Sequence, residues 1–251
     1  MWTEAYQDPR FVPIVLGTTA VSMGAFALFA APMTLLAWRD PESLRRFRIQ
    51  SRKPKQQKLV SASIGRWLVN NAILTALVVA AWPLLAHSRL RLDGPPPLWL
   101  ALVQFTSFVY VDDFLYYWVH RAMHAPFLYR HVHSVHHKIL TPWAVTGHYM
   151  HPVEFVVTGA LALLPAALVG AHLHVLWAWV AWRQWEATEG HCGYDFPWSP
   201  SHLFPGSDGA RHHDAHHARV KGNYSGFFAY LDGLFGTFAK GYVRGGTLAE
   251  K

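Results

Sequence analysis

The chain has 251 residues, of which 52% are hydrophobic and 15% are charged. Soluble domains carry about 25% charged residues, so this composition favours a membrane protein. The 12 Trp, 10 Tyr and 15 Phe residues exclude a disordered chain. The net charge of +7 fits basic loops beside a membrane, and no basic helix or known module indicates nucleic-acid binding. The single cysteine, Cys192, excludes an intramolecular disulfide and a cysteine-built metal cluster.

Three apolar stretches in the first half of the chain are candidates for membrane spans. Residues 11–38 and 67–86 contain no charged side chain, and residues 98–119 are apolar and aromatic apart from Asp112 and Asp113. A spanning helix needs about 20 apolar residues. We therefore expect three membrane crossings in this part of the chain.

The charge of the connecting loops predicts the orientation of these spans. Residues 39–58 hold eight Lys or Arg side chains against Asp40 and Glu42, and basic loops stay on the cytoplasmic side of a membrane. The linker 87–97 then lies outside. The third span returns inward, so the chain from His120 onward begins on the cytoplasmic side.

A fourth apolar region, residues 155–182, contains no Asp, Glu, Lys or Arg. Gly170 is the expected break, with Pro165 as a second. Two helices of roughly 15 residues would each reach about 22 Å, which fits a re-entrant hairpin that returns the later histidines to the side of the earlier ones.

The predicted fold is an all-α integral membrane protein, a bundle of about four transmembrane or re-entrant helical elements with a cytoplasmic histidine-rich helical cap. Residues 1–110 would form the N-terminal membrane anchor with the cytoplasmic basic loop 39–58. Residues 111–251 would form the catalytic region.

Seventeen histidines are unusual in a chain of this length, and eight of them lie in three clusters. Residues i, i+3 and i+4 share one face of a helix, so each cluster is expected to direct two or three imidazoles toward one point. Eight imidazoles are too many for one metal ion and suit two. Clusters poor in carboxylates favour Fe, Zn, Cu or Ni over Ca or Mg. The eight are His120, His124, His133, His136, His137, His213, His216 and His217.

Asp113 lies seven positions before His120, which is two helical turns. A buried carboxylate in a membrane helix is costly unless it is paired. We expect Asp113 to accept the distal N–H of a ligating histidine and fix its tautomer. The alternative is a helix-end charge at the membrane interface, which is the interpretation we prefer for Asp112.

The segments HRAMH (120–124), HSVHH (133–137) and HHDAHH (212–217), lying between apolar spans, resemble the three histidine boxes of the fatty acid hydroxylase (sterol desaturase) superfamily. The sterol C4-methyl oxidases are the most similar branch. Further similar stretches are 149–154, HCGYDFPW (191–198) and LDGLFGT (231–237), so that the resemblance covers residues 110–238. It implies a non-haem di-metal centre, O₂ as oxidant and an external electron donor.

The resemblance also assigns the metal-ligand role to those eight histidines and adds His191 as a ninth ligand. His151 would be a tenth ligand or would orient one, and Glu154, one helical turn later, would likewise bind the metal or support a ligand. His212 is expected beside the ligands rather than among them, and Asp214 is expected either to bind the metal or to support a ligand. Side chains expected to line a substrate path are His148, Trp143, Tyr149, Tyr117 and Trp198. Beyond the ligands, no separate catalytic residue is expected.

The expected activity is hydroxylation of an unactivated C–H bond of a lipid, with a sterol C4 methyl as the first candidate. Hydroxylation of a fatty acyl or other lipid, and desaturation, are alternatives within the same superfamily. A membrane metal-binding or transport protein is the alternative from another class, but transporters place their ligands near the bilayer midplane. The expected cofactors are two iron ions, with zinc as a substitute in a purified sample, and O₂. The expected partners are the bilayer, a sterol-like lipid and a cytochrome b5-like or ferredoxin-like carrier.

Overall fold

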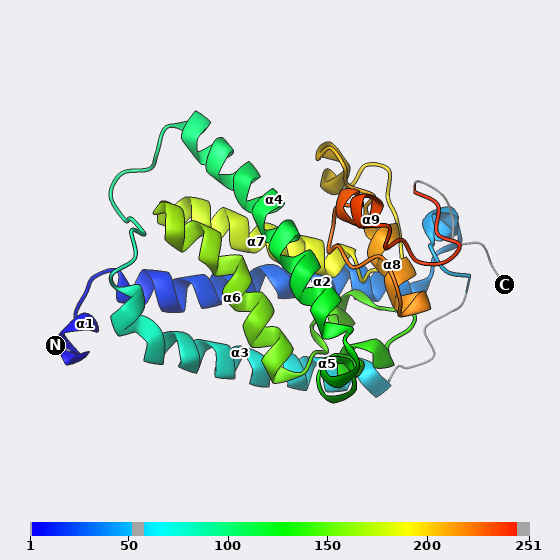
Figure 1. Ribbon diagram of the computed structural model, residues 1–251, viewed down its shortest axis with the longest axis horizontal. Coiled ribbons are helices and arrows are strands. Elements are labelled where there is room, and N and C mark those ends of the chain that lie inside the picture. The colour runs from blue at the N-terminus through cyan, green and yellow to red at the C-terminus, as the bar shows by residue number, and fades with distance from the viewer. Residues whose placement is uncertain (1, 52–57, 245–251) are drawn as a thin grey trace.

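Four helices of the computed structural model are long and apolar enough to cross a membrane: Val12–Arg39, Leu59–Leu85, Leu98–Met123 and Pro152–Val169. The structure describes residues 2–51 and 58–244. Helices and connecting loops make up these residues, with no strand among them (Figure 1). The expected all-α membrane fold is confirmed. Residues 52–57 of the expected basic loop lie outside the described residues.

The first three spans follow the expected stretches with shifted ends. A short helix α1 (Trp2–Ala5) precedes the π-helical turn η1 (Val12–Gly17), which continues into α2 (Thr18–Arg39). After the turn η2 (Glu42–Phe47), helix α3 covers Lys58–Leu85 and begins nine residues before the expected start. Helix α4 covers Leu98–Met123 and therefore carries His120 within its last turn.

The fourth apolar region forms the predicted helical hairpin. Helix α6 (Pro152–Val169) ends at Gly170, whose φ of 71° suits glycine, and α7 (Leu173–Glu189) runs back. His151 and His172 are the N-caps of the two helices, and each side chain accepts a backbone N–H. The break at Gly170 is thus confirmed, whereas Pro165 stays inside α6.

The helices form one bundle with the hairpin at its centre. Helix α2 packs against α7, α3 packs against α6, and α4 crosses both helices of the hairpin (Figure 1). Trp82, Phe108, Leu176 and Trp179 are buried where these helices meet. Large apolar side chains such as Leu28 remain exposed on the outer faces, as expected for contact with lipid.

Short helices and turns gather at the end of the bundle where α2, α4 and α7 terminate (Figure 1). This cap is the expected histidine-rich helical element. It contains α5 (Pro126–His131), η3 (His133–Lys138), η4 (Ala144–His148), η5 (Pro200–Leu203), α8 (Ala210–Arg219) and α9 (Tyr230–Phe235). Because α7 runs back from Gly170, the segments before and after the hairpin meet at this same end.

Candidate metal centre

Nine imidazoles converge into two adjoining groups in the cap. Within each group, the candidate ligand nitrogens all lie within 4.8 Å of one another. All nine side chains are buried except His124, which is half-buried. The first group is His120, His124, His133, His137 and His216, and the second is His136, His191, His213 and His217. The eight histidines of the three clusters and His191 are therefore brought together.

The second and third histidine clusters are each divided between the two groups, which contradicts the expectation that each cluster points toward a single spot. His133 and His137 belong to the first group, while His136 belongs to the second. In α8, His216 separates from His213 and His217 in the same way. Consecutive residues diverge by about 100° around the axis of α8 and by about 120° around the 3₁₀ turn η3, which directs neighbouring histidines to different groups. Each of the two HxxHH segments thus contributes histidines to both groups.

Four backbone carbonyls, from three separate segments of the chain, accept hydrogen bonds from the imidazole rings. The Nδ1–H of His120 donates to the carbonyl of Tyr224 at 2.7 Å, and that of His191 to Ala187 at 2.6 Å. His216 and His217 donate in the same way to carbonyls of Gly222 and Ile139, at 2.7 and 2.8 Å. A carbonyl only accepts, so Nδ1 carries the proton and Nε2 keeps its lone pair.

The Nε2 atoms then face one another at short distances. Those of His216 and His137 lie 2.9 Å apart, and those of His217 and His191 lie 3.0 Å apart. Burial lowers the pKa of His137 to about 3 and that of His191 to about 4, so the rings are neutral near pH 7. Converging lone pairs of neutral imidazoles are the donor set of a transition-metal ion. The residues present therefore fit two metal ions.

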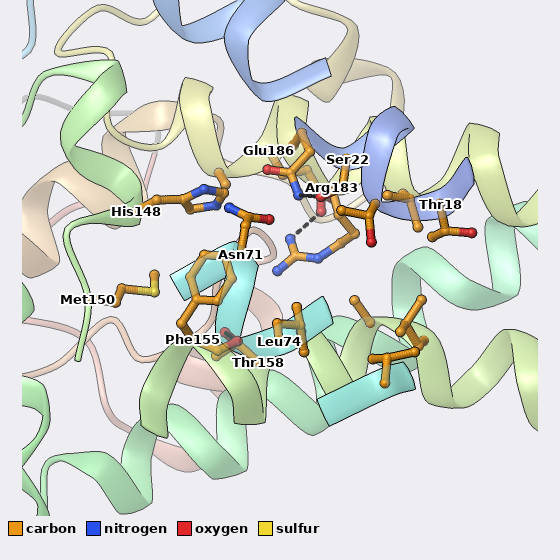
Figure 2. Close-up of a pocket in the computed structure, with 18 of the residues that line it drawn as sticks. Thr18, Ser22, Asn71, Leu74, His148, Met150, Phe155, Thr158, Arg183 and Glu186 are labelled. Carbon is orange, nitrogen blue, oxygen red and sulfur yellow. Dashed lines mark hydrogen bonds and ion pairs between the residues drawn. The ribbon is translucent and has the colours of Figure 1, made fainter. Parts of the chain in front are cut away.

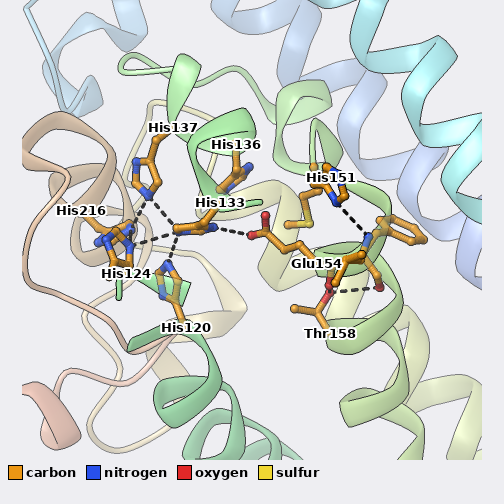
Figure 3. A network of polar contacts seen from close by, with 12 residues as sticks. His120, His124, His133, His136, His137, His151, Glu154, Thr158 and His216 are labelled. Atoms are coloured by element: carbon orange, nitrogen blue, oxygen red, sulfur yellow. Dashed lines mark hydrogen bonds and ion pairs between the residues drawn. The ribbon is translucent and has the colours of Figure 1, made fainter. Parts of the chain in front are cut away.

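Glu154 joins the first group from α6, as Figure 3 shows. Its Oε1 accepts the Nδ1–H of His133 at 2.7 Å, and both side chains are buried. A carboxylate in this position fixes the tautomer of a ligand and raises its basicity. His151, one turn earlier, caps α6 and belongs to neither group.

The hydrogen bond between Glu154 and His133 predicts how a substitution at Glu154 affects metal binding. We expect Glu154→Gln to weaken metal binding about 10- to 100-fold, because an amide accepts the His133 proton less strongly than a carboxylate. Metal content after dialysis against a weak chelator measures the effect. His151→Asn keeps an N-cap on the same helix and serves as the control. Equal metal retention in Glu154→Gln and wild type would remove Glu154 from the proposed support.

The structure corrects the role expected for Asp113. Its Oδ1 accepts the backbone N–H groups of Phe227 and Phe228 at 2.9 and 3.3 Å, and no histidine contacts it within the described residues. Two helical turns separate Asp113 from His120 by about 10 Å along the axis, which is too far for direct contact. Asp113 instead fixes the loop that follows Tyr224, whose carbonyl holds His120.

Asp232 supports the same loop and was not identified from the sequence. Its carboxylate accepts from His212 Nε2 at 3.0 Å and from the backbone N–H groups of Tyr224 and Ser225, both at 2.9 Å. The motif LDGLFGT at 231–237 was the available signal. His212 thus lies beside the ligands as expected. Asp214 accepts from Gln50 at 2.7 Å and contacts no histidine within the described part of the chain.

A cavity extends from the second histidine group into the helix bundle. Its empty volume is about 1150 Å³, including its open mouth, and its lining includes His191 and His213 together with side chains of α2, α3, α6 and α7 (Figure 2). Of the side chains expected along a substrate path, His148 lines this cavity. Trp143, Tyr149 and Tyr117 are buried elsewhere, and Trp198 is 63% exposed. Tyr116, one position before the expected Tyr117, faces the cavity instead.

The chain is similar to known proteins over most of its length. The family model described as fatty acid hydroxylase matches residues 105–237. The chain is 34% identical over 252 aligned residues to methylsterol monooxygenase 2-1 of Arabidopsis thaliana, covering 94% of this chain and 91% of that protein. It is 42% identical to a very-long-chain aldehyde decarbonylase of Oryza sativa subsp. japonica over 179 residues, covering 70% and 67%. No solved structure matches. With four helices able to span a bilayer, the chain is an integral multi-pass membrane protein, and it belongs to the fatty acid hydroxylase family.

Proposed function

We propose that the protein is a monooxygenase that hydroxylates a C4 methyl group of a sterol, using O₂, two iron ions and electrons from an external carrier. The observation that carries this proposal is the convergence of nine neutral imidazoles beside a cavity inside a membrane helix bundle. Similarity to proteins named methylsterol monooxygenase supports the sterol substrate.

The two histidine groups would each hold one iron ion. When bound, the irons supply the reduction of O₂ and the oxidising power that converts C–H to C–OH, with release of water. All-imidazole sites also accept zinc, so a purified sample can carry zinc in place of iron. A zinc-loaded protein would lack the redox chemistry.

The protein's own residues hold and shield this site. Backbone carbonyls and Glu154 keep the rings oriented, and burial keeps them neutral and able to bind metal. The cavity walls position the lipid and exclude water. The basic residues at 39–51 and 58 favour a cytoplasmic location for the cap, where a cytochrome b5-like or ferredoxin-like carrier would deliver electrons.

A second candidate is oxidation of a long-chain lipid, a substrate class that the similarity to proteins named very-long-chain aldehyde decarbonylase supports. Under this alternative, the cavity would take a long aliphatic lipid and the same centre would hydroxylate or desaturate it. The cavity is lined mainly by apolar side chains of the bundle helices, a lining that suits either class of lipid. The two candidates differ in which lipid yields product.

The test uses the full chain in lipid nanodiscs, loaded with Fe(II) and supplied with a chemical reductant and ¹⁸O₂. A 4,4-dimethyl sterol is compared with a fatty acyl lipid and a long-chain aldehyde, and products are identified by mass spectrometry. We expect one ¹⁸O atom in the C4 methyl group of the sterol. The zinc-loaded protein is the control and should give no product. Product from the acyl lipid or aldehyde alone would overturn the sterol assignment.

A further inference from the structure

A buried ion network borders the cavity beside the second histidine group and makes no contact with the histidines of that group. Arg183 of α7 lines the cavity, with its Nε 2.9 Å from Asp112 and its Nη1 2.6 Å from Glu186. Trp182 donates a further hydrogen bond to Glu186 at 2.8 Å. Burying three charges is costly and adds little stability compared with apolar residues. Stability alone therefore does not explain this network at the wall of the cavity, which indicates a functional role.

The guanidinium of Arg183 keeps hydrogen-bond donors that face the cavity. It carries five N–H donors, and its Nη2 has no acceptor within the described residues. The side chain is 18% exposed although it lies inside the bundle. Figure 2 shows Arg183 among His148, Asn71 and Glu186 at the same part of the cavity. An unpaired donor in an otherwise largely apolar cavity favours an oxygen atom of the ligand.

The charges around Arg183 determine which type of ligand oxygen can accept its hydrogen bond. One guanidinium faces two carboxylates, those of Asp112 and Glu186, so the formal charge of the cluster is already negative. A carboxylate of the ligand would add a third negative charge in a poorly solvated site. An uncharged hydroxyl or carbonyl oxygen accepts the hydrogen bond without this repulsion.

The position of Arg183 limits the distance between this oxygen and the reacting carbon. Its Cζ lies 5.8 Å from the centre of the Tyr116 ring, and that ring lies 5.1 Å from the ring of His120. A single aromatic ring therefore separates the guanidinium from the first histidine group. A ligand oxygen on Arg183 places only nearby carbons at the metal centre, not the far end of a long acyl chain.

We infer that Arg183, held by Asp112 and Glu186, is a polar subsite that binds an uncharged oxygen of the lipid close to the carbon that is oxidised. This inference rests on the proposed function, which provides the reaction. It adds that the substrate is an alcohol or carbonyl lipid whose polar group lies beside the reacting carbon, and that free fatty acids are excluded.

Ligand binding and product formation are both measured, so that the proposed subsite and the proposed reaction can be rejected independently of each other. Wild type and Arg183→Lys, which keeps the charge but loses the fork of donors, are each tested with a 4,4-dimethyl sterol and its 3-deoxy analogue. Binding is followed by ligand-induced thermal stabilisation of the metal-loaded protein in nanodiscs. We expect Arg183→Lys to weaken binding of the hydroxyl sterol roughly 10- to 100-fold and to leave binding of the deoxy analogue unchanged.

Arg66→Lys is the matched control, because Arg66 stacks on Tyr149 and does not line the cavity. A second variant, Glu186→Gln, removes one negative charge and should allow a free fatty acid to bind that wild type rejects. This gain cannot come from misfolding. Equal losses for both sterols in Arg183→Lys, or no gain of fatty acid binding in Glu186→Gln, would overturn the subsite. Arg183-dependent binding without any C4 oxidation would instead overturn the proposed reaction.

Discussion

Alanine at His136 or at His216 is expected to abolish turnover while the protein remains in the membrane. His136 belongs to the second group and His216 to the first, so each variant should lose one of two metal ions. We expect activity to fall by about a thousandfold or more, because the proposed oxidation would need the metal ions that these histidines would hold. Metal content per chain and product formation in nanodiscs are the two measurements.

The histidine variants need a control that separates ligand loss from general damage. His87 lies in the linker beyond α3, where its Nδ1 contacts the carbonyl of Pro83 at 2.9 Å. His87→Ala should keep both metal ions and normal turnover. Full activity in His136→Ala or His216→Ala would contradict the ligand assignment. Loss of both ions from each variant would indicate that the two centres form only as a unit.

A single methyl group at Gly147 is expected to disrupt the second centre. A Cβ at this position would lie 2.9 Å from His191 Nδ1 and 2.9 Å from the carbonyl oxygen of Ala187. These two atoms form the hydrogen bond that orients His191. The carbonyl belongs to the backbone of α7 and cannot yield easily, so the imidazole must move. We expect Gly147→Ala to lose one metal ion and to destabilise the fold by about 1–3 kcal/mol.

Thermal unfolding with and without metal, together with metal content, measures this effect. Gly65→Ala in α3 is the matched control, because a Cβ there would meet no neighbouring segment of the described chain within 4 Å. Replacing glycine by alanine inside a helix there should stabilise the protein by about 0.5–1 kcal/mol. Wild-type metal content in Gly147→Ala would contradict the role that we assign to His191 as a ligand of the second group.

Much of the fold was predictable because its signals are local. Uncharged stretches of membrane-spanning length indicated α2 and α3, and the break at Gly170 indicated the α6–α7 hairpin. The ends of the spans were less predictable. The apolar stretch 98–119 marked only the membrane-spanning part of α4, and the helix continues four residues further through the first histidine cluster.

The histidine side chains of the site were predictable from their spacing, whereas their supports were not. The acceptors for His120 and His216 are backbone carbonyls of residues 224 and 222. Every residue has a backbone carbonyl, so residue identity does not indicate which carbonyl accepts a hydrogen bond. Asp113 was a reasonable acceptor by spacing, but the fold directs it to the loop instead. Tyr116 rather than Tyr117 faces the cavity, since helix packing decides which of two adjacent residues turns inward.

The amino-acid sequence alone determined that this chain is helical, enters the membrane and carries enough clustered imidazoles for two metal ions. These properties follow from composition and short-range periodicity. Only the tertiary structure decided how the imidazoles divide between two groups, which acceptors orient them, and that Arg183, which lines the cavity, pairs with Asp112. Each of these depends on contacts between segments tens of residues apart, such as the 2.9 Å ion pair between α4 and α7. Packing of the whole bundle sets such contacts, and no local pattern encodes them.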